Sequence, residues 1–222
     1  KHGHVLVFLW DFPKPTEFYS DLPVYDLKSI GAPIEAGFSK RDITPRIGQW
    51  VAGFMPPHPG LSVKDRLWVK SLALKDKNGE SVVIVSCDLI GLLPDELDKI
   101  FSLVKNVPRE RIFVTTTHTH SGPDSMGLWI WKNKKYMKFL RAQVASAIGE
   151  SVSNMGPSAI RFGQGEFSGY ANGRDENPAD PTVSVIQVLI KNLPVTVVDY
   201  ACHPDIIEGF QFSAGFPYFF CE

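Results

Sequence analysis

The chain of 222 residues lacks several features that would place it in a common class of protein. It has three cysteines (Cys87, Cys202 and Cys221) without any Cys-x-x-Cys spacing, so neither a zinc ribbon nor a disulfide framework is indicated. Basic and acidic residues nearly balance, 23 Lys and Arg against 24 Asp and Glu, which makes nucleic acid an unexpected partner. The motifs GxSxG, HExxH, GxxxxGKS and GxGxxG are absent, which removes the standard serine hydrolase, zincin and nucleotide-binding interpretations.

The apolar run near the start of the chain is short. Val5–Trp10 contains six residues, far too few to span a bilayer. It is either the tail of a signal or anchor segment or an interior strand, and both interpretations carry equal weight. Because prolines are scattered between residues 11 and 33, we expect residues 1–35 to be an irregular lead-in. The domain proper is expected to span residues 36–222.

The hydrophobic pattern that follows is typical of an α/β domain. Residues 67–74 and 81–86 flank the turn 76–79 and predict a hairpin. Residues 94–104 have helical spacing, residues 111–117 are the next strand, and such a strand–helix–strand unit favours a parallel crossover. We therefore expect a mixed, partly parallel β-sheet core flanked by helices. Further elements are a strand from residue 36, a helix over 134–152, and strands over 159–163, 183–190 and 195–200.

Two histidines directly follow the strand predicted at 111–117. His118 and His120 are separated by Thr119, and the chain then breaks at Gly122 and Pro123. Side chains alternate along a strand, so both imidazoles would lie on the same face. Paired imidazoles at a strand end are typical of a metal or catalytic site, although a hydrogen-bonded surface pair has the same pattern.

A third histidine lies at the end of another predicted strand. His203 follows the strand 195–200 and precedes Pro204. By itself it would be more typical of a buried structural residue. In an open α/β sheet, however, ligands gather beyond the carboxyl ends of strands, so His203 becomes a candidate for one site shared with His118 and His120.

Two charged residues are weaker candidates. Asp88 also stands at a strand end, where it could orient a ligating imidazole from the second shell, or act as a helix cap or loop carboxylate. Arg174 lies in a polar loop, where an arginine is more often a surface residue; in a cleft it could hold a substrate oxygen. His2, His4 and His58 are not assigned to the site.

Five segments, taken in order, resemble the neutral/alkaline, non-lysosomal ceramidase family. The most specific are the two histidine motifs, and the resemblance runs from about residue 36 to the end of the chain. The segments are Thr115-Thr116-Thr117-His118-Thr119-His120-Ser121-Gly122-Pro123, Tyr200-Ala201-Cys202-His203-Pro204, Ala36 to Pro45, Val51-Ala52-Gly53-Phe54 and Ser86-Cys87-Asp88-Leu89.

The resemblance implies a zinc-dependent amidohydrolase that cleaves the N-acyl amide of ceramide to sphingosine and a fatty acid. His118 and His203 would be zinc ligands, and His120 would stabilise the oxyanion near the scissile amide. Arg174 would help to bind the substrate head, and Gly53 would lend its backbone to the site. The implied partner is a ceramide-like lipid amide, met at a membrane by peripheral contact, and the implied location is extracellular, periplasmic or membrane-associated.

The family's serine segment, Gly-Asp-x-Ser-Pro, and a later Glu and Tyr that complete the zinc shell have no counterpart in residues 1–222. Gly215 also stands where the family usually has Asp. We therefore expect roughly the first half of the catalytic domain: a fragment, a truncated gene product or a shorter relative. The alternative is a non-catalytic remnant of the fold that binds a lipid or a protein through aromatic segments such as Trp50, Phe54 and residues 129–131.

Overall fold

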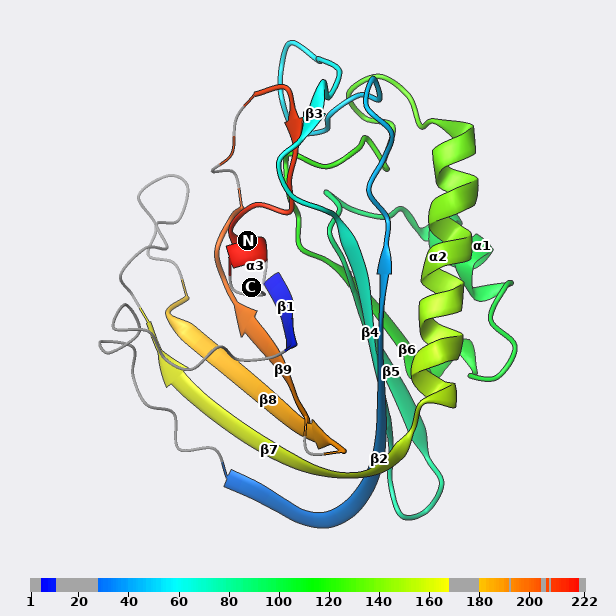
Figure 1. The fold of residues 1–222 in the computed structure, drawn as a ribbon, viewed down its shortest axis with the longest axis vertical. Coiled ribbons are helices and arrows are strands. Elements are labelled where there is room, and N and C mark those ends of the chain that lie inside the picture. Colours follow the sequence, from blue (N-terminus) through cyan, green and yellow to red (C-terminus); the bar gives the residue numbers. More distant parts are fainter. Residues whose placement is uncertain are drawn as a thin grey trace.

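The computed structural model describes residues 5–10, 28–167, 180–191, 193–204, 207 and 209–219. Among them, eight strands form one sheet, two short strands form another, and helices flank the larger sheet (Figure 1). The elements in chain order are β1 (Val5–Trp10), β2 (Lys28–Asp42), β3 (Ser62–Val63), β4 (Trp68–Lys75), β5 (Ser81–Cys87), α1 (Pro94–Phe101), the 3-10 turn η2 (Arg109–Arg111), β6 (Ile112–Thr116), α2 (Lys134–Ser153), β7 (Gly156–Glu166), β8 (Thr182–Ile190), β9 (Leu193–Tyr200), β10 (Gln211–Phe212) and α3 (Phe216–Phe219).

The large sheet is mixed, as predicted. Its order is β1-β9-β8-β7-β2-β4-β5-β6. The predicted hairpin is the antiparallel pair β4 and β5, and its turn is closed by Asp76, whose Oδ1 accepts the Glu80 amide at 2.8 Å. The predicted crossover is also confirmed, because β6 pairs parallel to β5 after α1. All other neighbouring pairs in this sheet are antiparallel.

The apolar run at the start of the chain is a strand. β1 pairs antiparallel with β9, with Val5 opposite Tyr200 and Trp10 opposite Val195. Of the two interpretations of this run, the structure therefore shows the strand. β2 also begins earlier than expected, at Lys28, so two parts of the stretch 1–35 have regular structure. Local pattern does not reveal this, because the strand that completes each pair lies far along the chain.

β2 bends the sheet. Its first part, Lys28–Ala36, pairs with β7, and its second part, Glu35–Asp42, pairs with β4, with a register shift between Ile30 and Ile34. A bulge of this kind increases local twist and curvature. The sheet curls until β1 contacts β5 and β6 from the opposite edge. Its concave face buries a small core drawn from β2, β4, β8 and β9, which includes Phe38, Leu72, Val188 and Val197.

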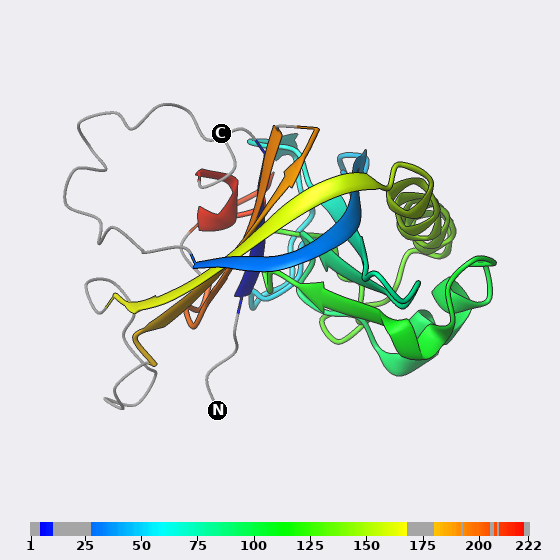
Figure 2. The same ribbon diagram turned by 90° about the horizontal axis from the view of Figure 1, so that it is seen from below.

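α2 packs mainly over β2 and β4, and α1 lies beside α2 (Figures 1 and 2). α2 begins at a capping residue, Asn133, whose Oδ1 accepts the amides of Lys135 and Tyr136. Its side chains Leu140, Val144 and Ile148 are fully buried in the main core. Both helices were predicted, although α1 ends at Phe101, three residues before the apolar spacing does.

Cys87 lies in the same core and packs there as a small, fully buried residue. Burial raises the pKa of its thiol, so it stays protonated. Within the described ranges, no helix combines the length and apolar character needed to cross a bilayer.

Candidate metal centre

The three predicted histidines lie together at the carboxyl ends of two strands. The ring centroids of His118 and His120 are 5.1 Å apart, those of His118 and His203 are 5.0 Å apart, and those of His120 and His203 are 4.7 Å apart. One nitrogen from each ring lies within 4.8 Å of the others, so the cluster could hold a metal ion. His118 follows β6 and His203 follows β9, and five strands of the curled sheet separate them.

The two neighbouring histidines do not meet by strand alternation. β6 ends at Thr116, and the chain then adopts a left-handed conformation at His118, with φ of 60°. Such a backbone is uncommon for a non-glycine residue and marks a functional or constrained position. The two imidazoles do lie close together, but the backbone conformation after β6 brings them there, not the alternation of side chains along a strand. This local conformation was not evident in the sequence.

A backbone carbonyl orients His118. Its Nδ1 lies 2.7 Å from the carbonyl oxygen of Ile90. A carbonyl only accepts hydrogen bonds, so Nδ1 carries the proton and Nε2 is the lone-pair nitrogen. Metal-binding histidines commonly have this arrangement, because the outer hydrogen bond fixes the tautomer and the ring orientation.

Asp88, expected to orient an imidazole, is held by different groups. It is buried, and its Oδ2 accepts the amide of Trp68 at 2.8 Å. Burial raises the pKa of the Asp88 carboxyl, while the charge of Lys70 and the hydrogen bond from Trp68 oppose that rise. The Ile90 carbonyl, two residues further along, is the group that contacts His118.

Gly53 lies directly against the ring of His120. A Cβ at this position would be 2.4 Å from Nδ1 and 2.6 Å from Cγ of that ring, and the φ of Gly53 is +91°. Only glycine accommodates both the close approach and the positive φ. Gly53 thus lies next to His120, and its lack of a side chain determines where His120 can lie.

Aromatic rings line one side of the cluster. Phe54 meets His120 edge to face at 6.1 Å and stacks on His58 at 5.7 Å. Phe210 also contacts His58, with ring centroids 4.7 Å apart. The sequence pattern assigns no role to His58, which lies in a Pro-rich loop five residues after Gly53.

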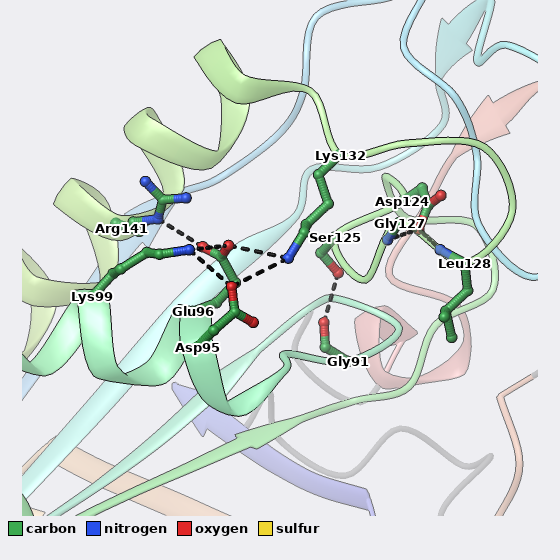
Figure 3. A network of polar contacts seen from close by, with 10 residues as sticks. All are labelled: Gly91, Asp95, Glu96, Lys99, Asp124, Ser125, Gly127, Leu128, Lys132 and Arg141. Carbon is green, nitrogen blue, oxygen red and sulfur yellow. Dashed lines mark hydrogen bonds and ion pairs between the residues drawn. The ribbon is translucent and has the colours of Figure 1, made fainter.

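A second aromatic pocket lies outside the histidine cluster. Trp50 and Trp131 meet edge to face at 6.3 Å, and Asp124, Asn133 and Tyr136 also line this pocket. The carboxylate of Asp124 accepts hydrogen bonds from the backbone amides of residues 127–130. Figure 3 draws two of these four donors. These amides organise the loop that carries the aromatic segment 129–131. Arg174 lies outside the described residues.

The fold is that of a neutral ceramidase-like domain, as the sequence resemblance predicted. The crystal structure of neutral ceramidase from Pseudomonas aeruginosa superposes with a TM-score of 0.62 at 20% identity, covering 73% of this chain and 30% of that chain. A ceramidase complexed with C2 gives a TM-score of 0.60 at 21% identity, with the same shares of both chains. This chain thus spans about a third of the length of the structures it matches. No protein-family model and no curated protein sequence matches it.

Proposed function

We propose that this chain carries part of the active site of a zinc-dependent amidohydrolase that cleaves the N-acyl amide of a ceramide-like lipid. The observation that carries the proposal is the cluster of three imidazoles, with a nitrogen from each within 4.8 Å of the others. The likeness of the fold to ceramidase structures supports the substrate class.

The donor set suits zinc. Neutral imidazole is a usual zinc ligand, so two of the three rings could bind the ion while the third remains free to act on the substrate. Zinc–nitrogen bonds of about 2.0–2.1 Å in a tetrahedron place the nitrogens about 3.4 Å apart. The widest pair in the cluster would therefore close by up to roughly 1.4 Å, which side-chain rotation can supply.

In this proposal His118 and His203 bind the metal. The lone pair on Nε2 of His118 is available because Nδ1 donates to the Ile90 carbonyl. His203 follows β9, the strand next to the edge opposite β6, and is half-buried. When bound, zinc would supply an acidified water or a polarised amide carbonyl.

His120 is assigned to the substrate. It is only 8% exposed, and contact with Gly53 and Phe54 fixes its ring. A donor so placed can stabilise the oxyanion of an amide under attack, an effect typically worth about 3–4 kcal/mol of barrier. Arg174 is proposed to hold the substrate head. Asp88 is proposed to support the metal site without contacting the metal.

The aromatic side of the site suits a lipid. Phe54, His58 and Phe210 form a wall next to His120, along which an acyl chain could lie. Met55 and Leu61, in the same loop region, are 78% and 61% exposed, which supports peripheral contact with the lipid surface that holds such a substrate. An extracellular, periplasmic or membrane-associated location belongs to the same proposal.

Metal analysis tests the proposal. The purified chain should bind one zinc per molecule, and His118→Ala and His203→Ala should each lose it. His120→Ala should retain zinc, and His58→Ala, a histidine outside the cluster, is the matched control and should also retain it. Absence of zinc in the unmodified chain at neutral pH would refute the proposal. Loss of zinc in His120→Ala would instead make His120 the third ligand.

Hydrolysis of a short-chain fluorescent ceramide tests the substrate separately. Turnover that falls at least about 100-fold in His120→Ala, with zinc retained, is expected for an oxyanion donor. Zinc binding without turnover would indicate that the serine segment of the family is needed to complete the site. Ceramide binding without any metal would favour the non-catalytic alternative.

A further inference from the structure

A buried carboxylate outside the histidine cluster fastens the loop that carries two of the histidines. We propose that Asp65, acting through Ser213, is a positioning residue that sets the geometry of His118, His120 and His203. The part of this inference that concerns metal affinity rests on the proposed function; the part that concerns the loop does not.

Asp65 and Ser213 form a closely bonded pair. Asp65 follows β3 and is 6% exposed, and Ser213 follows β10 and is fully buried. The hydroxyl of Ser213 donates to Oδ2 of Asp65 at 2.5 Å, and the amide of Ala214 donates to Oδ1 at 2.6 Å. Both carboxylate oxygens are therefore used to hold one short backbone segment. A buried carboxylate is stable only with such partners.

The backbone of Ser213 binds the histidine loop on both sides of its centre. Its carbonyl accepts the hydroxyl of Thr119 at 2.8 Å, and its amide donates to the carbonyl of Ser121 at 2.9 Å. Thr119 lies between His118 and His120, so these two bonds bracket His120 in the chain. Any shift of Ser213 is thus transmitted to the backbone of both histidines.

The same stretch of chain also carries the third histidine. His203 precedes Ser213 by ten residues, and between them the carbonyl of Ile207 accepts the hydroxyl of Ser121 at 2.5 Å. β9 and β6 are not neighbours in the sheet, so strand pairing does not fix the distance from His203 to His118. Besides the contact of β1 with β5 and β6, direct bonds between the two loops help to fix it, and the Asp65–Ser213 pair anchors those bonds to β3.

Glu96 provides a matched control for Asp65. It is a buried carboxylate of similar exposure, 1%, but its hydrogen bonds connect α1 to α2 and to the loop before α2 (Figure 3). Its oxygens accept Arg141 at 2.7 Å, Lys99 at 3.0 Å and Lys132 at 3.1 Å. Ser71 is the control for Ser213, since it is equally buried and bonds Ser151 at 2.8 Å between β4 and α2. Both controls should lower stability without acting on the histidine loop.

The test titrates each purified chain with Co²⁺ alone and follows its visible absorption bands, which report affinity and coordination geometry. Asp65→Ala should weaken Co²⁺ binding by about 10- to 100-fold, as loss of outer-shell support typically does, and should alter the band shape. Ser213→Ala should weaken it less, because the Ala214 amide still binds Asp65. Glu96→Ala and Ser71→Ala should stay within about twofold of the unmodified chain, even where they unfold at lower denaturant concentration.

Unchanged Co²⁺ binding in Asp65→Ala and Ser213→Ala, or equal weakening in both controls, would overturn the inference. If Asp65→Ala does not fold, Ser213→Ala against Ser71→Ala decides the same question. If the unmodified chain binds no Co²⁺, the proposed function fails, and hydrogen exchange then tests the positioning role. Asp65→Ala should raise exchange selectively in residues 117–123, and the absence of that selectivity would refute the role.

Discussion

The contact between Gly53 and His120 gives a sharp prediction. Replacing Gly53 by alanine adds a Cβ that would lie 2.4–2.8 Å from three atoms of the His120 ring. Ordinary contacts begin near 3.4 Å, so the ring must retreat by about 1 Å. The φ of +91° adds roughly 1–2 kcal/mol of backbone strain for any residue with a Cβ. Overpacking against a fixed ring adds about 1–3 kcal/mol.

The matched control is Gly79 in the β4–β5 turn. Its φ is +86°, almost that of Gly53, but nothing lies within 4 Å of the position a Cβ would take. Gly79→Ala therefore measures the backbone strain alone, at roughly 1–2 kcal/mol. The difference between the two variants isolates the contact with His120. We expect Gly53→Ala to lose a total of about 2–5 kcal/mol in urea unfolding.

Two further measurements locate the effect of Gly53→Ala. The ¹⁵N and ring-proton resonances of His120 should shift in Gly53→Ala and stay unchanged in Gly79→Ala. Where turnover is measurable, a displacement of about 1 Å should reduce it on the order of 100-fold. If Gly53→Ala is no less stable than Gly79→Ala and leaves the His120 resonances unmoved, the close approach does not position His120.

Two predictions concern pH. In the Glu96 network, burial alone would raise the pKa of the carboxyl, but hydrogen bonds from Arg141, Lys99 and Lys132 outweigh it and lower that pKa. The ionised Glu96 carboxyl therefore stabilises the folded state at pH values above its pKa in the unfolded chain. This stabilisation is lost as the pH falls through its lower pKa in the folded chain. Glu96→Gln should lower the free energy of unfolding by about 2 kcal/mol at pH 7, a moderate value because the partners of Glu96 are partly exposed. In urea unfolding experiments this loss should shrink below about pH 4. A loss that stays constant with pH would contradict the prediction. Asp88 has the opposite sign, because burial raises its pKa: the stability of the unmodified chain relative to Asp88→Asn should fall as pH rises through that raised pKa. A flat difference between pH 4 and 8 would show that Asp88 is not perturbed.

Much of the fold follows from local pattern. Hydrophobic periods of two and 3.6 residues depend only on neighbours in the chain. They predict the hairpin at 67–86, the helix at 134–152 and the parallel crossover through residues 94–117. The sheet order does not follow in this way. β1 and β9 pair from opposite ends of the sequence, and β2 joins two halves of the sheet through its register shift.

The candidate ligands can be recognised in the sequence as the histidines at 118, 120 and 203, which follow predicted strands, and the family resemblance adds Gly53. How these residues meet depends on the whole sheet, because it must curl to bring β9 close to the edge formed by β6. The same holds for the groups that fix the site, the Ile90 carbonyl behind His118 and the Asp65–Ser213 pair behind the loop. Their hydrogen bonds join residues far apart in the chain, and a pattern of neighbouring residues contains no information on such contacts.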